Sequence, residues 1–109
     1  MADILEAIAR CERYVAVLDG GYPDVIDMAE DAIERNLQII GEAENHLTAE
    51  VFAAHPEIAW PQIRGFRNIL VHEYFGVDID VIRDVVNNFL PPLERAMRQH
   101  VAANSREDA

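Results

Sequence analysis

Apolar residues recur at helical spacing along almost the whole chain. In the first segment they follow the three-then-four spacing that lines one stripe of a helix: Ile4, Ile8, Cys11, Val15 and Leu18. Asp3 suits the cap or the first turn of this helix. Gly20 and Gly21 are expected to end it, because glycine tolerates the left-handed backbone of a helix stop.

A long second helix is predicted to begin near Asp24, directly after Pro23. Its apolar stripe consists of Ala29, Ile33, Leu37, Ile40 and Leu47. Gly41 lies inside this helix, where a glycine is less favourable than alanine by about 1 kcal/mol. We therefore expect another stretch of backbone to approach the helix closely at Gly41.

The remaining pattern predicts three more helices. Thr48 caps a short one that ends near Ala54, and a proline-containing connector follows over residues 55–61. The next is predicted from Pro61 to Phe75, ended by Gly76, with the stripe Ile63, Phe66, Leu70 and Tyr74. The last begins at Asp78 or Asp80 and carries the stripe Ile82, Val85, Val86, Phe89, Leu93 and Met97. Pro91 and Pro92 must kink or restart it, because proline lacks an N–H and crowds the preceding turn.

These elements predict an all-α fold, since no segment shows the alternation of a strand. We expect an antiparallel bundle of four main helices plus the short one. Residues 1–103 form the predicted single domain, and residues 104–109 are expected to be a frayed tail. The third helix carries apolar groups on both of its faces, which is typical of a helix buried against its own bundle on one side and a partner subunit on the other. A homodimer is therefore expected.

Charge limits what the protein can bind. The chain has 109 residues and a formal net charge of −11, from 20 acidic residues and nine arginines, with no lysine. A chain of this charge repels a phosphate backbone, so nonspecific coating of nucleic acid is excluded. Any contact with RNA must run through a local cluster of cations or through a basic partner. Ser105 and Thr48 are the only residues of their types and have no base beside them, which excludes Ser-His-Asp chemistry.

Cofactor, metal and membrane signals are missing from the pattern. Cys11 is the sole cysteine, so it cannot form an internal disulfide and is expected in the core. The histidines show no metal-ligand spacing, so no metal or cofactor is expected. No apolar run reaches the roughly 18–20 residues of a membrane span, and no basic-then-apolar leader opens the chain. We expect a cytoplasmic protein with no membrane partner.

The residues most suited to chemistry lie between Gly65 and Gly76. Arg67, followed after four residues by His72 and then by Tyr74, forms the pattern R-x-x-x-x-H-x-Y. With this motif and its flanks, the chain resembles the HepT-like branch of the HEPN ribonucleases. The flanking segments that carry the resemblance are residues 3–8, 39–43, 55–60 and 90–93, with the sequences DILEAI, IIGEA, HPEIAW and LPPL.

The resemblance implies a specific function. HepT-like proteins are helical homodimers that cut RNA, and not DNA, without a metal. They act as the toxin of a type VII toxin–antitoxin pair, whose antitoxin is an MntA-like nucleotidyltransferase that transfers AMP to the motif tyrosine, here Tyr74. Arg67 and His72 carry over as the catalytic pair, and Asn68 as the polar neighbour that usually follows the arginine.

The chemistry of these side chains fits that implication. Histidine titrates near neutral pH and can take a proton from the 2′-hydroxyl or give one to the leaving 5′-oxygen. Arginine stays charged and can donate two parallel hydrogen bonds to phosphate oxygens. In a straight helix, however, positions five apart differ by about 140° around the axis, so Arg67 and His72 do not share a stripe. Three arrangements would bring the two side chains together: the long side chain of Arg67 wraps round the helix, the helix is distorted, or two copies of the chain complete one cleft. We favour the shared cleft. Glu42 is a candidate to orient Arg67 or His72.

Each of these residues also has a purely structural interpretation. His72 suits a dimer interface, Arg67 an ion pair with Glu42, and Tyr74 the apolar core. Asn68 suits a hydrogen bond to its counterpart across a dimer. The rival function is accordingly a noncatalytic helical dimer that binds RNA or a nucleotide, or that only docks a nucleotidyltransferase.

Overall fold

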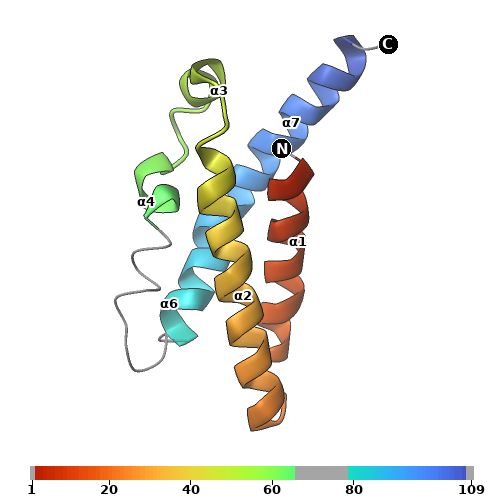
Figure 1. Ribbon diagram of the computed structural model, residues 1–109, viewed down its shortest axis with the longest axis vertical. Coiled ribbons are helices and arrows are strands. Elements are labelled where there is room, and N and C mark those ends of the chain that lie inside the picture. Colours follow the sequence, from red (N-terminus) through yellow and green to blue (C-terminus); the bar gives the residue numbers. More distant parts are fainter. Residues whose placement is uncertain (1, 66–78, 108–109) are drawn as a thin grey trace.

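The computed structural model describes residues 2–65 and 79–107, and the regular structure in this part of the chain is entirely helical (Figure 1). In chain order the helices are α1 Ala2–Val17, α2 Pro23–Glu44, α3 Ala49–Ala54, α4 Trp60–Arg64, α6 Ile79–Asp84 and α7 Leu90–Glu107, with a π-helical turn, η1, over Val85–Phe89. The predicted all-α class is therefore confirmed, and the described residues contain no strand.

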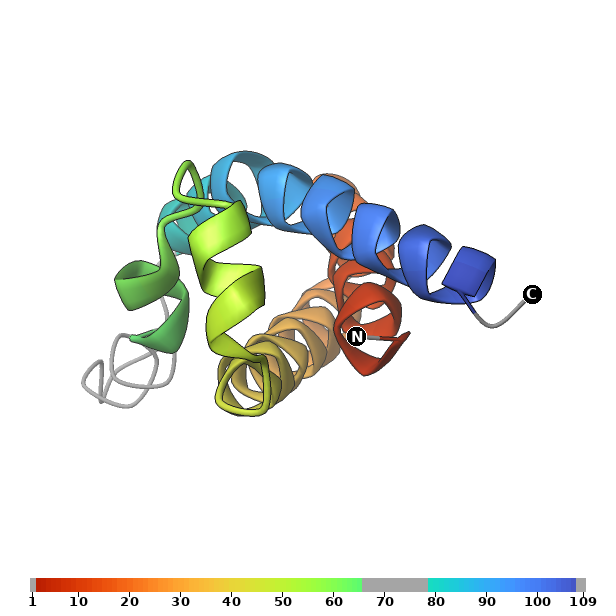
Figure 2. The ribbon, with the colours of Figure 1, turned by 90° about the horizontal axis from the view of Figure 1, so that it is seen from above.

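The hairpin of α1 and α2 is the centre of the bundle. The two helices lie side by side and run in opposite directions (Figures 1 and 2). Their facing stripes are buried as predicted, with Ile8 and Cys11 on α1 and Ile33, Leu37 and Ile40 on α2. Burial raises the pKa of the Cys11 thiol to about 12, with a further contribution from Glu12, so this thiol is an inert part of the core.

The turn after α1 corrects one expectation. The predicted left-handed stop is wrong, because neither Gly20 nor Gly21 has a positive φ. Instead, the N–H groups of both glycines donate to the Val17 carbonyl, at 3.4 and 3.2 Å. A Cβ on Gly21 would lie 3.2 Å from that same oxygen. Close approach, rather than backbone handedness, is what favours glycine at position 21.

A rod made of α6, η1 and α7 crosses the hairpin and packs against α1 (Figure 2). The predicted restart at Pro91 and Pro92 takes the form of the π turn, in which the Leu90 N–H donates to the Val85 carbonyl five residues back. A wider turn suits this place, since each proline ring would otherwise crowd the carbonyl four residues before it.

The inward face of this rod matches the predicted stripe. Ile82, Val85, Val86, Leu93 and Met97 are buried, and Phe89 is half-buried against them. The helix continues to Glu107, through residues 104–107 of the predicted tail.

Candidate functional site

The predicted catalytic motif lies outside the described residues. Arg67, Asn68, His72 and Tyr74 fall in the segment 66–78, between α4 and α6. Of the predicted third helix the structure describes the first turn, α4, with Ile63 fully buried as expected. The described element directly before the motif in the chain is α4, which contacts parts of α2 and α3.

Gly41 sets the distance between α2 and α4. A Cβ built on Gly41 would lie 3.4 Å from the Ile63 carbonyl oxygen and 4.0 Å from that of Arg64. The close backbone approach predicted at this glycine is thus confirmed, and the approaching chain is α4. The last turn before the motif segment is held against the middle of the bundle at this point.

Trp60 and His55 fix the other side of α4. The Trp60 indole Nε1 donates to the His55 carbonyl at 3.0 Å, and its ring meets the edge of Phe52 with centroids 4.9 Å apart. Trp60 and His55 are both buried. The short helices α3 and α4 are therefore joined by a hydrogen bond and a ring contact.

His55 also connects this region to α7. Its Nε2 lies 2.8 Å from Nε2 of His100, and its Nδ1 lies 3.2 Å from Glu57 Oε1. Since a carboxylate oxygen can only accept, His55 Nδ1 donates to Glu57, and between the two Nε2 atoms one ring donates and the other accepts. A hydrogen bond from its own backbone N–H, aided by His55, lowers the pKa of Glu57.

The end of α2 carries two glutamates with opposite environments. Glu42, the predicted orienting acid, is exposed, and its proposed action on Arg67 or His72 stays a prediction. Glu44 is only 1% exposed and forms an ion pair with Arg64 of α4, with Nη2 and Oε1 3.5 Å apart. Neither carboxylate oxygen of Glu44 has a hydrogen-bond partner among the described residues.

Sequence reasoning missed Glu44, although a signal was present. Glu44 follows Ile33, Leu37 and Ile40 at the same helical spacing, so it occupies a position of the core stripe. A carboxylate at such a position is unusual, because burial favours its neutral form. Burial raises the pKa of Glu44, while the charge of Arg64 opposes that shift.

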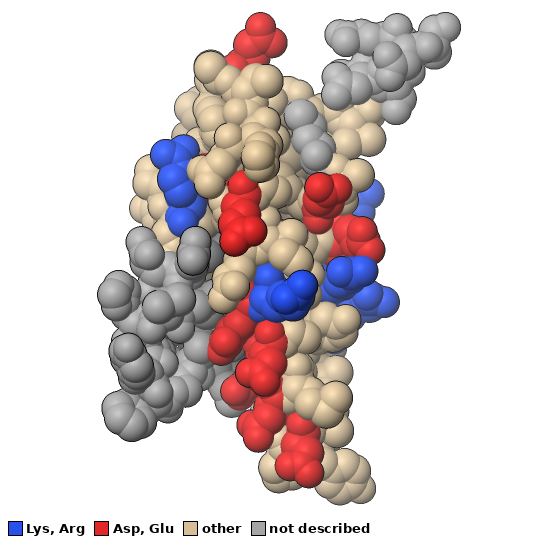
Figure 3. All heavy atoms as spheres, viewed as in Figure 1, with Lys and Arg blue, Asp and Glu red and all other residues tan. Residues whose placement is uncertain are grey.

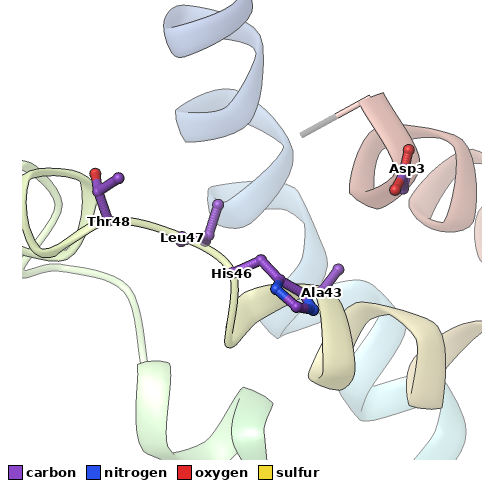
Figure 4. Close-up of a pocket in the computed structure, with 5 residues that line it drawn as sticks. All are labelled: Asp3, Ala43, His46, Leu47 and Thr48. Carbon is purple, nitrogen blue, oxygen red and sulfur yellow. The ribbon is translucent and has the colours of Figure 1, made fainter.

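A pocket of about 260 Å³ lies at the other side of the α2 end (Figure 4). Asp3 of α1 and Ala43, His46, Leu47 and Thr48 line it. It holds a carboxylate and an imidazole from different elements, without a hydrogen bond between them, and it contains none of the predicted site residues. The described residues place no group of three or more His, Cys, Asp or Glu side chains together where they could hold a metal ion.

Charge divides the surface seen in Figure 3. Acidic side chains form a stripe along the first half of α2, where the acids are Asp24, Asp27, Glu30, Asp31 and Glu34. Partial burial, followed by the neighbouring aspartates, raises the pKa values of Glu30 and Glu34. Positive charge lies over α4, whose one cation is Arg64, and also in the middle of this face, where α2 and α1 lie. A polyanion would thus be repelled along the first half of α2, and Arg64 offers it a positive charge at the last turn of α4.

A family model described as "Ribonuclease HepT-like" matches residues 4–100, which include the whole motif segment. The chain belongs to the HepT-like ribonuclease family. This membership confirms the predicted family and the predicted enzyme class, an endoribonuclease.

Three curated relatives are similar to this HepT-like chain. The "Probable ribonuclease HepT" of Thermococcus cleftensis is 33% identical over 96 residues, 86% of each chain. "Putative RNase MJ1380" of Methanocaldococcus jannaschii is 32% identical over 95 residues, 85% of each chain. "Putative RNase TTE0752" of Caldanaerobacter subterraneus is 38% identical over 68 residues, which are 62% of this chain and 61% of that relative. No solved structure matches the chain. No helix in the described part is both long and apolar enough to cross a membrane.

Proposed function

We propose that this HepT-like protein is a metal-independent endoribonuclease that acts as the toxin of a type VII toxin–antitoxin pair. The observation that carries the proposal is the family match over residues 4–100, because it spans the R-x-x-x-x-H-x-Y pattern of Arg67, His72 and Tyr74. The close approach of α4 to Gly41 is consistent with it, since α4 directly precedes this segment in the chain and packs against the bundle.

The proposed reaction is an internal transesterification. The 2′-oxygen of RNA attacks the adjacent phosphorus, the bond from phosphorus to the 5′-oxygen breaks, and the products are a 2′,3′-cyclic phosphate and a 5′-hydroxyl. His72 takes the proton of the 2′-hydroxyl or supplies the one that the leaving oxygen needs. Arg67 stabilises the extra negative charge on the phosphorane, and Asn68 supports the pair with its amide.

A homodimer completes this site in the proposal. Two copies of the motif facing one cleft would supply two imidazoles, one for each proton transfer, and two guanidinium groups. They would also concentrate positive charge locally on a chain whose net charge is −11.

The proposed partner is an MntA-like nucleotidyltransferase acting on Tyr74. The tyrosine oxygen attacks the α-phosphorus of ATP, pyrophosphate leaves, and a tyrosyl adenylate forms. The added group brings bulk and a negative phosphate next to Arg67, so it would compete with the RNA phosphate for the same cation. Mass spectrometry after co-expression with a candidate MntA-like nucleotidyltransferase tests this step. Adenylate mapped to any residue other than Tyr74 contradicts it.

The cleavage activity is tested with purified protein and total RNA in the presence of a chelator. The wild-type protein should cut, and His72→Ala should lower the rate at least a hundredfold, the usual scale of a lost acid–base group. His46→Ala is the matched control, because His46 is an exposed histidine that lies outside the motif and lines the pocket beside Asp3. Equal cutting by His72→Ala, or RNA binding without any cutting by the wild-type protein, would favour the noncatalytic dimer instead.

A further inference from the structure

Arg64 differs from the other arginines that form ion pairs in the described part of the chain. Arg10, Arg83 and Arg98 each have a carboxylate oxygen within 3 Å, on a side chain that is itself at least one quarter exposed. At each of these three pairs, water or an approaching anion therefore contacts both the arginine and its carboxylate. The partner of Arg64 is the fully buried Glu44, at 3.5 Å. In this pair the solvent therefore contacts the arginine but not the glutamate.

Two side-chain contacts hold the Arg64 guanidinium while leaving it accessible. Glu44 lies on its protein side, and the Phe52 ring centroid lies 6.0 Å from its central carbon, within the range of a cation–π contact. The backbone of Arg64 is held by the approach of α4 to Gly41. The side chain is nevertheless 58% exposed. An arginine fixed in this way has N–H groups left to donate to an external oxyanion.

The burial of Glu44 is costly and needs an explanation other than stability. A carboxylate removed from water without hydrogen bonds destabilises a protein, and a single ion pair at 3.5 Å compensates for only part of that loss. An apolar residue would fit this position of the α2 stripe better. A buried acid beside an exposed guanidinium can, however, fix the orientation in which its N–H groups meet an external anion.

We propose that Arg64 is a binding residue for a phosphate of the RNA substrate, and that Glu44 and Phe52 are the positioning residues that hold its guanidinium. The proposal rests on the proposed ribonuclease function, and it names a contact outside the R-x-x-x-x-H-x-Y motif. Arg64 precedes Arg67 by three residues in the sequence. The acidic stripe along α2 then repels the strand from the neighbouring face (Figure 3).

The test measures binding of a fluorescent single-stranded RNA in chelator, with every variant built on His72→Ala so that the RNA stays intact. One lost phosphate contact lowers the slope of log affinity against log salt by about 0.7 for a single strand, which is about fivefold in affinity at 0.1 M salt. Arg64→Gln should show both effects. Arg98→Gln is the matched control, because it removes the same charge from an exposed arginine on α7 and should change affinity less than twofold.

Glu44→Gln distinguishes an effect on the orientation of the Arg64 guanidinium from an effect of the protein's net charge. It keeps the shape of the side chain and makes the protein less negative, so an effect of charge alone would tighten binding. The proposal expects binding two- to threefold weaker, because the guanidinium loses its fixed orientation. Arg64→Lys should keep the salt slope and still weaken binding, since lysine lacks the planar fork. If Arg64→Gln unfolds because it leaves Glu44 unpaired, the double variant Glu44→Gln with Arg64→Gln replaces it.

The outcomes distinguish this inference from the function on which it rests. Equal affinities for Arg64→Gln and Arg98→Gln, or tighter binding by Glu44→Gln, overturn the assignment of Arg64 even if the wild-type protein cuts RNA. An Arg64-dependent salt slope in a protein that never cuts supports the assignment and contradicts the ribonuclease proposal. Absence of any RNA binding by the His72→Ala protein overturns the assignment.

Discussion

The α1–α2 hairpin and the region around α3 and α4 are held together by different forces. Between α1 and α2 the buried contacts are almost all aliphatic, with Ile8, Ile33 and Leu37 on facing stripes. Around α4 the structure buries a carboxylate, Glu44, and an imidazole, His55, the two groups of these kinds that are buried in its described part. The hairpin supplies stability, whereas the second region arranges polar groups around α4, which directly precedes the motif segment in the chain, at a cost in stability.

The largest expected effect is a loss of stability from a substitution in the α1–α2 hairpin, with the cleavage activity unchanged. Ile33→Ala removes a fully buried side chain from α2 and should lower the free energy of unfolding by about 3 kcal/mol. Urea unfolding followed by circular dichroism measures this change. Val25→Ala on the same helix is the control, because Val25 is exposed and its truncation should change stability by less than about 0.5 kcal/mol.

RNA cleavage by the folded Ile33→Ala protein, at a temperature well below its unfolding, should stay within about twofold of wild type. A large loss of cleavage rate with the fold intact would show that the hairpin is part of the site, and the contrast between the two regions would then fail.

A smaller effect is expected at Trp60, which joins α3 to α4. Trp60→Phe keeps a ring against Phe52 and removes the donor to the buried His55 carbonyl, so it should lower the free energy of unfolding by about 2 kcal/mol. The cleavage rate should fall as well, because α4 directly precedes the motif segment in the chain. Stability lost without any change in cleavage rate would mean that this hydrogen bond serves the fold only.

The smallest and most specific effect concerns Glu44 and pH. Because burial raises the folded-state pKa of this carboxyl, its ionised form destabilises the folded protein above the unfolded value of 4.5. Glu44→Gln should therefore be at least as stable as wild type at neutral pH, and its advantage should shrink as the pH falls through the folded pKa towards 4.5. Urea midpoints at a series of pH values measure it. A wild-type protein that is the more stable at neutral pH contradicts this interpretation.

The sequence predicted the hairpin and the rod well because their packing is periodic. Ile4, Ile33 and Met97 are buried as their spacing requires, and Gly41 marks a close approach of the α4 backbone, whose Ile63 carbonyl oxygen lies 3.4 Å from where a Cβ would stand. The Glu44–Arg64 pair was missed because pairing depends on tertiary structure: α2 and α4 come together only through the fold. His55 and His100 meet for the same reason, across 45 positions of sequence.

Local backbone geometry was predicted less well. The stop after α1 needs close packing at Gly21 rather than a left-handed residue, and the two prolines are accommodated by a π turn in the preceding residues. Both outcomes depend on how the chain packs after the element ends. The motif residues Arg67, His72 and Tyr74 were identified from their pattern alone, and their roles stay predictions.

The chemistry of cleavage is the most direct test of the central claim. In chelator, the wild-type protein should convert a single-stranded RNA oligonucleotide into fragments ending in a 2′,3′-cyclic phosphate and a 5′-hydroxyl, and it should leave the same sequence uncut when the scissile nucleotide lacks its 2′-hydroxyl. Fragments with 3′-hydroxyl ends, or equal cutting of the 2′-deoxy strand, would contradict the account.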